Sequence, residues 1–190
     1  MIRGIIFDCF GVLHVDVTSS YFSHFPALSE ELHDLNVRAD HGFLDRQSYL
    51  HEAAKITGKS IEEVSHGIAM ENTLNKSLVD YIKTTLRPHY KIGMLSNVGR
   101  GWINDFFSEH DLHDLFDEAI LSSEEGITKP NPLIFERAAE RLGLTSQECV
   151  MIDDRLENCR GAEETGMKAI EFKNNEQMII ALEKLLEAKE

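Results

Sequence analysis

Six polar residues of this 190-residue chain are of types that can do chemistry, and most of them come directly after an apolar run. They are Asp8 after "IRGIIF", Ser96 and Asn97 after "KIGML", Lys129 in "ITKPNP", and Asp153 and Asp154 after "CVMI". An aspartate or a Ser-Asn pair at the end of a strand is common turn chemistry, so each residue alone says little. Together, in one order along one chain, they predict a shared site.

The three aspartates suggest a metal. Asp8 and Asp154, together with Asp153, would repel one another if they gathered without a cation. Mg²⁺ prefers one or two carboxylates, with carbonyl oxygens, water and substrate phosphate as its remaining ligands. The sequence therefore predicts a Mg²⁺ site at these carboxylates, with Asp153 at its edge.

The other three residues suit a phosphate group. The Ser96 hydroxyl and the Asn97 amide can hydrogen-bond to phosphate oxygens, and Lys129 supplies a compensating positive charge. A carboxylate such as Asp8 can act as a nucleophile and form an aspartyl-phosphate. A cation and Lys129 beside it would stabilise the developing charge where it forms. We therefore expect phosphoryl transfer through Asp8.

Short apolar runs that alternate with helical patterns must position these residues. We expect strands over 2–7, 91–96, 118–121, 149–153 and 168–172. We expect helices over 76–86, 101–112, 131–143, 155–166 and 174–189. This alternation indicates an α/β protein with a parallel sheet and helices on both faces, and such sheets bind ligands at the carboxyl ends of their strands. The predicted site lies at that edge.

The stretch 15–75 breaks this alternation, because it holds no convincing strand. Its pattern is that of four short helices, over 16–25, 29–39, 43–58 and 60–70. We expect a small helical cap inserted after the first strand, with 1–14 and 76–190 forming the core. An insertion that leaves from the carboxyl edge of a sheet is placed to cover the site. Candidates within it for the substrate entrance are Phe43, Arg46 and Tyr49.

The composition excludes several classes of partner. The formal net charge of −14 argues against nucleic acid, although a cation and one lysine still allow a small anionic ligand. No apolar run approaches the roughly 20 residues that span a bilayer, and "MIRGIIFD" is too short for the core of a signal peptide. Three scattered cysteines favour a reduced, cytoplasmic protein. The sequence leaves the oligomeric state open.

The order of the six residues resembles that of the haloacid dehalogenase-like (HAD) hydrolase superfamily, in the subfamily with a helical cap after the first strand. The resemblance covers essentially the whole chain, including "KPNPLIFERAAERLG". It implies a Rossmann-like core of five parallel strands in the order 5-4-1-2-3. It also implies that Asp8 is the nucleophile, Ser96 binds phosphate, Lys129 steadies both, and Asp154 and the Phe10 carbonyl hold Mg²⁺. The substrate would be a small phosphorylated metabolite.

Phe10 departs from this pattern. Most phosphatases of the superfamily have an aspartate two residues after the nucleophile, which protonates the leaving group and later activates water. Here that acid is missing. One interpretation is a phosphatase whose leaving group needs less help, as in a sugar 1-phosphate, or whose acid comes from the cap or the substrate. His14, just beyond Phe10, is one candidate for such a stand-in.

Two other interpretations remain. Metal-independent 2-haloacid dehalogenases of the superfamily also have an aromatic residue and a glycine after the nucleophile, much as in "DCFG". Halide leaves without a proton, so such an enzyme needs no acid. A third possibility is a catalytically weak protein that binds phosphate or a partner. The Asp153-Asp154 pair would have no evident purpose in a metal-free dehalogenase, so it favours the phosphatase.

Overall fold

The computed structural model describes residues 1–15, 18–70 and 73–187. Its central feature is a five-stranded sheet in the order β5-β4-β1-β6-β7, in which every neighbouring pair is parallel. The strands are β1 (Gly4–Phe7), β4 (Lys91–Ser96), β5 (Glu118–Leu121), β6 (Cys149–Asp153) and β7 (Lys168–Glu171). When these five strands are numbered 1 to 5 along the chain and the sheet is followed from β7 to β5, this is the predicted order 5-4-1-2-3. The expected α/β core is therefore confirmed.

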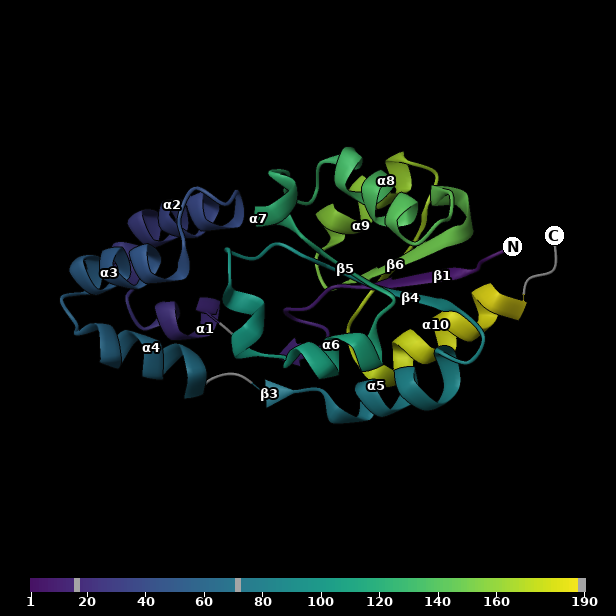
Figure 1. Cartoon of the computed structure of the whole chain (residues 1–190), viewed down its shortest axis with the longest axis horizontal. Helices are drawn as coiled ribbons and strands as arrows, with labels where there is room; N and C mark the ends of the chain where they lie inside the picture. The colour runs from purple at the N-terminus through teal and green to yellow at the C-terminus, as the bar shows by residue number, and fades with distance from the viewer. Residues whose placement is uncertain (16–17, 71–72, 188–190) are drawn as a thin grey trace.

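Helices cover both faces of this sheet (Figure 1). On one side lie α5 (Lys76–Tyr81), α6 (Glu109–Leu115) and α10 (Asn175–Glu187), and on the other α8 (Pro132–Arg141) and α9 (Leu156–Glu164). Side chains of a strand alternate between faces, so Ile5 and Phe7 belong to the core beneath α5 and α10, whereas Ile6 belongs to the core beneath α8 and α9. Burial on both faces explains why β1 is an unbroken apolar run.

One predicted helix is wrong. The stretch 101–112 is not continuous: it forms a 3₁₀ turn, η3 (Trp102–Asp105), followed by α6. Ser108 starts the second helix, because its hydroxyl accepts a hydrogen bond from Asp111 N at 3.1 Å and Asp111 Oδ2 accepts one from Ser108 N at 3.3 Å. This reciprocal capping box satisfies donors at a helix start, so Ser108 separates the two elements. The stretch 76–86 similarly ends in a π-helical turn, η2 (Ile82–Leu86).

The inserted segment is helical, apart from its two ends. Its helices are α1 (Thr18–Ser23), α2 (Ser29–Asp40), α3 (Arg46–Thr57) and α4 (Ile61–Met70), with a 3₁₀ turn η1 (Pro26–Leu28). The expectation of no strand between 15 and 75 is wrong, because β2 (His14–Val15) pairs antiparallel with β3 (Thr73–Leu74). The outgoing and returning chains run side by side there and satisfy each other's backbone groups. Residues 16–17 and 71–72 of the predicted cap lie outside the described residues.

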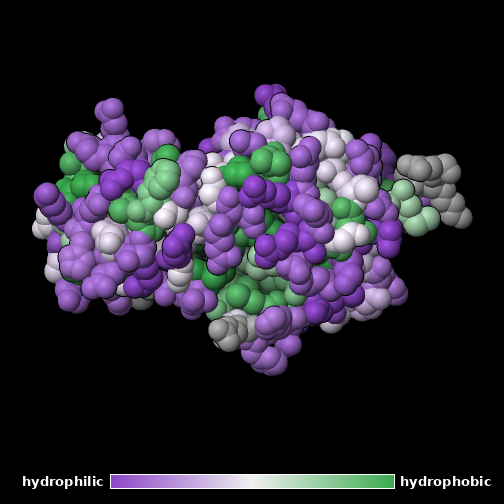
Figure 2. Space-filling model, turned by 45° about the horizontal axis from the view of Figure 1, so that its top comes forward, coloured by the Kyte–Doolittle hydropathy of each residue, from purple (hydrophilic) through white to green (hydrophobic). Residues whose placement is uncertain are grey.

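Figure 1 places α1–α4 together beside the sheet, at the end away from both chain termini. The space-filling view has the same outline, with the α1–α4 lobe on the left and a largely hydrophilic surface (Figure 2). Among the described helices, none combines the length and apolar character that crossing a membrane requires. The three cysteines are all buried and free. That 1–14 and 76–190 form one domain and 15–75 a separate cap domain stays a prediction.

Candidate active site

The strand register brings the predicted residues to one edge of the sheet. Phe7 of β1 lies opposite Met94 of β4 and Ile152 of β6, so these strands end at nearly the same level. Asp8 directly follows β1, Ser96 ends β4 and Asp153 ends β6. All three polar side chains are buried. A parallel sheet therefore gathers, at its carboxyl edge, residues that are up to 145 positions apart in the chain (8 to 153).

Lys129 lies at the centre of this edge. Its buried Nζ is 2.7 Å from Asp8 Oδ1 and 2.7 Å from Asp153 Oδ2, and it donates to Leu95 O at 3.0 Å. Burial works against the positive charge, but Asp8 and Asp153 outweigh it and hold the pKa of Lys129 above its usual value. Lys129 is thus a charged ammonium group with all three protons directed at oxygens.

The Asp8 carboxylate has fewer hydrogen-bonding partners than the Asp153 carboxylate. Its Oδ1 accepts a hydrogen bond from Cys9 N at 2.7 Å as well as the contact with Lys129. Burial raises the pKa of Asp8 to about 8, Lys129 opposes this, and the nearby Asp153 and Asp154 add to the rise. One ammonium group does not compensate three carboxylates, so a second cation would favour the ionised, nucleophilic form of Asp8.

Asp153 is held in place by its surroundings. Besides Lys129, it accepts hydrogen bonds at Oδ1 from Arg155 N and Asn158 Nδ2, both at 2.9 Å, at the start of α9. Burial would raise its pKa, but Lys129 and these donors together keep the pKa of Asp153 below the usual value. Both oxygens of Asp153 are engaged, which suits a residue that orients Lys129 at the edge of a metal site.

Asp154 completes an acidic cluster. Oxygen atoms of Asp8, Asp153 and Asp154 lie within 4.8 Å of one another, and Asp154 is exposed. Gly11 has φ +91°, and a Cβ there would lie 2.5 Å from Asp154 Cγ, so the backbone at Gly11 lies directly against this carboxylate. Carboxylates packed closely against bare backbone form a cradle of hard oxygen donors that fits Mg²⁺. The Phe10 carbonyl as a further ligand stays a prediction.

Ser96 and Asn97, the two predicted phosphate ligands, differ in their hydrogen bonds. Ser96 Oγ is buried and makes no hydrogen bond to the residues that the structure describes, so it is available to a phosphate oxygen. Asn97 instead bonds to the backbone of Lys129: its Oδ1 accepts from Lys129 N at 2.8 Å and its Nδ2 donates to Lys129 O at 2.9 Å. Asn97 thereby fixes the lysine loop onto the end of β4, a contact that its sequence position did not reveal.

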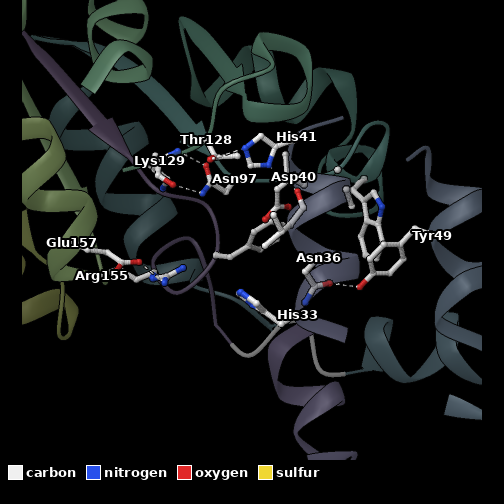
Figure 3. A pocket seen from close by; sticks show the side chains of 16 residues that line it. His33, Asn36, Asp40, His41, Tyr49, Asn97, Thr128, Lys129, Arg155 and Glu157 are labelled. Carbon is white, nitrogen blue, oxygen red and sulfur yellow. Dashed lines mark hydrogen bonds and ion pairs between the residues drawn. The ribbon is translucent and has the colours of Figure 1, made fainter. Parts of the chain in front are cut away.

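A pocket of about 430 Å³ opens above this edge (Figure 3). Phe10, Asn97 and Lys129 line it from the sheet, and Arg155 and Glu157 line it from the start of α9. The facing wall comes from α2 and α3, with the polar residues His33, Asn36, Asp40, His41 and Tyr49. The inserted helices therefore form one wall of this pocket.

The sequence interpretation found only part of this wall. Tyr49 lines the pocket as expected, whereas Phe43 is 75% exposed and lies outside the lining. The polar residues of α2 were missed because a polar helix face normally faces solvent. Their positions 33, 36 and 40 follow helical spacing on one face, which is the signal that could have identified them.

His14 does not take part in the pocket wall. It is buried, and its ring packs edge-on against Phe107 at 4.9 Å and Phe106 at 5.3 Å between ring centroids. Phe10 packs on the same Phe106 at 5.0 Å. Neither His14 nor Phe10 therefore presents an acid to the pocket. A replacement for the missing general acid is to be sought on the inserted helices, which form the facing wall.

Solved structures of similar fold span most or all of the chain. A predicted HAD-like family hydrolase from Porphyromonas gingivalis has a TM-score of 0.81 and 27% identity, covering 100% of both chains. A HAD enzyme from Bacteroides thetaiotaomicron, solved with magnesium and inorganic phosphate, has a TM-score of 0.77 and 22% identity over 91% of this chain and 95% of that one. A 2-haloacid dehalogenase from Pseudomonas syringae has a TM-score of 0.59 and 19% identity, over 89% and 85%.

Curated relatives match over shorter stretches. Glyceraldehyde 3-phosphate phosphatase of Methanopyrus kandleri is 43% identical over 63 residues, which are 33% of this chain and 27% of that protein. The enzyme of that name from Pyrococcus abyssi is 36% identical over 87 residues, which are 44% of this chain and 36% of that protein. The matched stretches thus span about a third of these relatives. The family description "haloacid dehalogenase-like hydrolase" matches residues 2–166, and the chain therefore belongs to the haloacid dehalogenase-like hydrolases.

Proposed function

We propose that this hydrolase is a Mg²⁺-dependent phosphatase that acts on a small phosphorylated metabolite through an aspartyl-phosphate at Asp8. The observation that carries the proposal is the buried Asp8–Lys129–Asp153 arrangement beside Asp154, because it combines a nucleophile, a fixed cation and an acidic cradle for a second cation. The relatives named as glyceraldehyde 3-phosphate phosphatases support a sugar phosphate as substrate. The Bacteroides enzyme solved with magnesium and phosphate supports the cofactor.

Each residue has a role in this reaction. The phosphoryl group would accept a hydrogen bond from Ser96 Oγ, and the positive charge of Lys129 beside Asp8 would stabilise it. The Asp8 carboxylate would attack phosphorus in line with the leaving oxygen. Water would then attack the phosphorus of the aspartyl-phosphate, which releases inorganic phosphate and restores Asp8. Mg²⁺, held by Asp8, Asp154 and the Phe10 carbonyl with Asp153 at the edge, would neutralise phosphate charge as Asp8 approaches.

A metal-independent dehalogenase would use the same nucleophile on carbon. The likeness to the Pseudomonas dehalogenase extends to the fold alone, at 19% identity. Such a reaction gives no purpose to the exposed Asp154 carboxylate packed against Gly11. The acidic cradle therefore favours the phosphatase.

The test is a substrate screen with Mg²⁺ and with EDTA. Glyceraldehyde 3-phosphate, other sugar phosphates, aryl phosphates and 2-chloropropionate would be compared, with release of phosphate or chloride as the readout. We expect Mg²⁺-dependent release of phosphate, which falls to background in Asp8→Asn because an amide is a far weaker nucleophile than a carboxylate. Asp114→Asn, a change at a surface carboxylate with 49% side-chain exposure, is the matched control.

Beryllium fluoride gives a second readout, since it mimics the acyl-phosphate and should protect the wild type but not Asp8→Asn against thermal unfolding. Phosphate release that persists in a verified Asp8→Asn sample would show direct attack by water instead. Chloride release that is insensitive to EDTA, without phosphatase activity, would establish the dehalogenase.

A further inference from the structure

We propose that Asp40, at the end of α2, is the general acid and base of the phosphatase reaction and takes the role that an aspartate at position 10 would have. The inference rests on the proposed function and adds to it a catalytic residue from the inserted helices. It follows from the position of Asp40 in the pocket, from its attachment to the sheet and from the state of the other polar groups nearby.

Asp40 lines the same pocket as Lys129, which contacts the Asp8 carboxylate at 2.7 Å. It lines the wall that faces Asn97 and Lys129, and its charge interacts with those of Lys129 and Arg155 across the cavity. Figure 3 shows it between the Asn97–Lys129 side of the pocket and Tyr49. A substrate whose phosphate lies at Lys129 would therefore extend its leaving group toward the wall that carries Asp40.

The backbone at Asp40 is fastened to the end of β4. Ser122 Oγ donates to Asp40 O at 2.6 Å and accepts from Val98 N at 3.0 Å, so one hydroxyl joins α2 to the strand end that carries Ser96. Gly42 lies so close to Ser123 O that a Cβ there would collide with it. This attachment fixes Asp40 relative to the phosphate-binding residues, as a catalytic acid requires.

The protonation of Asp40 suits the role. Burial raises its pKa to about 6, and the positive groups of His41, Lys129 and Arg155 limit the rise. His33 on its own helix, Tyr49 on α3 and Glu157 on α9 are the other titratable side chains on the walls around it. A carboxyl group that titrates near neutral pH can both give and take a proton under working conditions.

Three other polar groups of the same wall, those of Asn36, His41 and Tyr49, are already engaged. The Tyr49 hydroxyl donates to Asn36 Oδ1 at 2.5 Å, and burial raises the pKa of Tyr49 far above neutrality. His41 Nδ1 contacts Val37 O at 2.9 Å, and its Nε2 contacts Thr128 Oγ1 at 3.4 Å.

Across the pocket, Glu157 is paired with Arg155. Among these described side chains, Asp40 is thus the carboxyl group best placed to exchange protons with a substrate.

The proton balance is as follows. In the first step Asp8 forms a bond to phosphorus, the bond from phosphorus to the leaving oxygen breaks, and the Asp40 carboxyl proton passes to that oxygen. In the second step Asp40, now a carboxylate, takes a proton from water. The water oxygen bonds to phosphorus, the bond to Asp8 breaks, and Asp40 regains its acid form while inorganic phosphate is released.

The test compares wild type and Asp40→Asn on two phosphates at saturating Mg²⁺. An alkyl phosphate needs a proton on its leaving oxygen, whereas p-nitrophenyl phosphate does not. We expect kcat/KM for the alkyl phosphate to fall by about 10²–10⁴-fold and that for p-nitrophenyl phosphate by less than about tenfold. Because the second step loses its base, Asp40→Asn should release one equivalent of nitrophenolate in a burst before slow turnover.

The pH profile gives an independent readout. In the wild type, kcat/KM for the alkyl phosphate should decline as pH rises above the pKa of Asp40, because the acid form is lost. This decline should be absent in Asp40→Asn. Asp34→Asn is the matched control, since Asp34 is on the same helix, is 70% exposed and lies outside the pocket lining.

Each outcome is decisive. Equal losses on both phosphates, or no loss on either, with wild-type activity intact, would overturn the role of Asp40 and leave the proposed phosphatase standing. No turnover of p-nitrophenyl phosphate by the wild type would overturn the phosphatase, and the role of Asp40 with it. If Asp40→Asn does not fold, Asp40→Ser and the wild-type dependence of kcat/KM on leaving-group pKa, which should be shallow, decide instead.

Discussion

The two walls of the pocket are built on different physical principles. At the sheet edge, Asp8, Lys129 and Asp153 are buried ionisable groups, and Lys129 Nζ lies 2.7 Å from an oxygen of each aspartate. On the inserted helices, apolar residues and the buried Tyr49 hold α2, α3 and α4 together, and the pocket residues His33, Asn36, Asp40 and His41 lie at the surface of this packing. The charges at the edge are therefore part of the stability of the fold, whereas those on the helices are not.

From this difference we expect the sheet edge to carry out the reaction and the inserted helices to recognise the substrate. Buried ion pairs tolerate almost no displacement, because an unpaired charge at low dielectric is costly. A helix surface can change its side chains without loss of the helix. The sheet edge should thus hold the phosphate in one fixed geometry, while the helices set the substrate and, through Asp40, supply the proton.

Lys129→Met gives the largest expected effect. Removal of the ammonium leaves the buried Asp153 carboxylate without its charged partner, so the free energy of unfolding should fall by about 3–5 kcal/mol. Phosphatase activity should fall to background. Urea unfolding with and without Mg²⁺ measures this, and Mg²⁺ should restore part of the loss because it replaces the missing cation. A variant as stable as wild type without metal would show that the edge does not rely on its charges.

Asp154→Asn should affect the metal and not the fold. Residues outside the ligand shell alone can alter metal affinity by about 10–100-fold, so loss of a ligand should cost at least that much. Titration calorimetry with Mg²⁺ measures the affinity. The unfolding midpoint without metal should stay the same or rise, because Asp154 is exposed and repels the nearby Asp153. Unchanged Mg²⁺ affinity would remove Asp154 from the ligands.

Gly42→Ala tests how α2 is attached to the sheet. Gly42 has φ +78°, and its neighbour Ser123 O leaves no room for a Cβ; Gly58 has φ +68° but open space around it. Both alanine variants should lose about 1–2 kcal/mol from the left-handed backbone. Gly42→Ala should lose about 1–3 kcal/mol more from the clash and lower kcat on alkyl phosphates. Equal losses in thermal and urea unfolding would mean that this contact is not tight.

The smallest effect is expected for the pair Arg38–Glu52, which joins α2 to α3. The guanidinium contacts both carboxylate oxygens, at 2.7 and 3.1 Å, with both side chains 39% exposed. Solvent screening limits such a pair to a coupling energy of about 0.2–1 kcal/mol. A double-mutant cycle with Arg38→Gln and Glu52→Gln in urea unfolding measures it. A coupling energy as large as the loss of about 3–5 kcal/mol expected for Lys129→Met would remove the contrast between the two walls.

The sequence by itself determined the sheet and the chemical residues on it. The three central strands β1, β4 and β6 are largely apolar runs that are buried on both faces, and the alternation of all five strands with helices leaves a parallel sheet as the natural arrangement. Asp8, Ser96 and Asp153 could be placed because each stands where such a run stops. The helices of the insert could also be predicted, since a period of 3.6 residues is a local pattern.

Only the tertiary structure decided how these pieces meet. The carboxamide of Asn97 pairs with the backbone of Lys129, 32 residues away, and Ser122 joins Val98 to Asp40, 82 residues away. Side chains such as these have many possible partners, and no local period shows which one folding brings near. The break at Ser108 depended likewise on a cap that competes with an otherwise helical pattern. Nothing in the local sequence distinguishes Asp40 from the other acidic residues, and only the fold places it in the same pocket as Lys129.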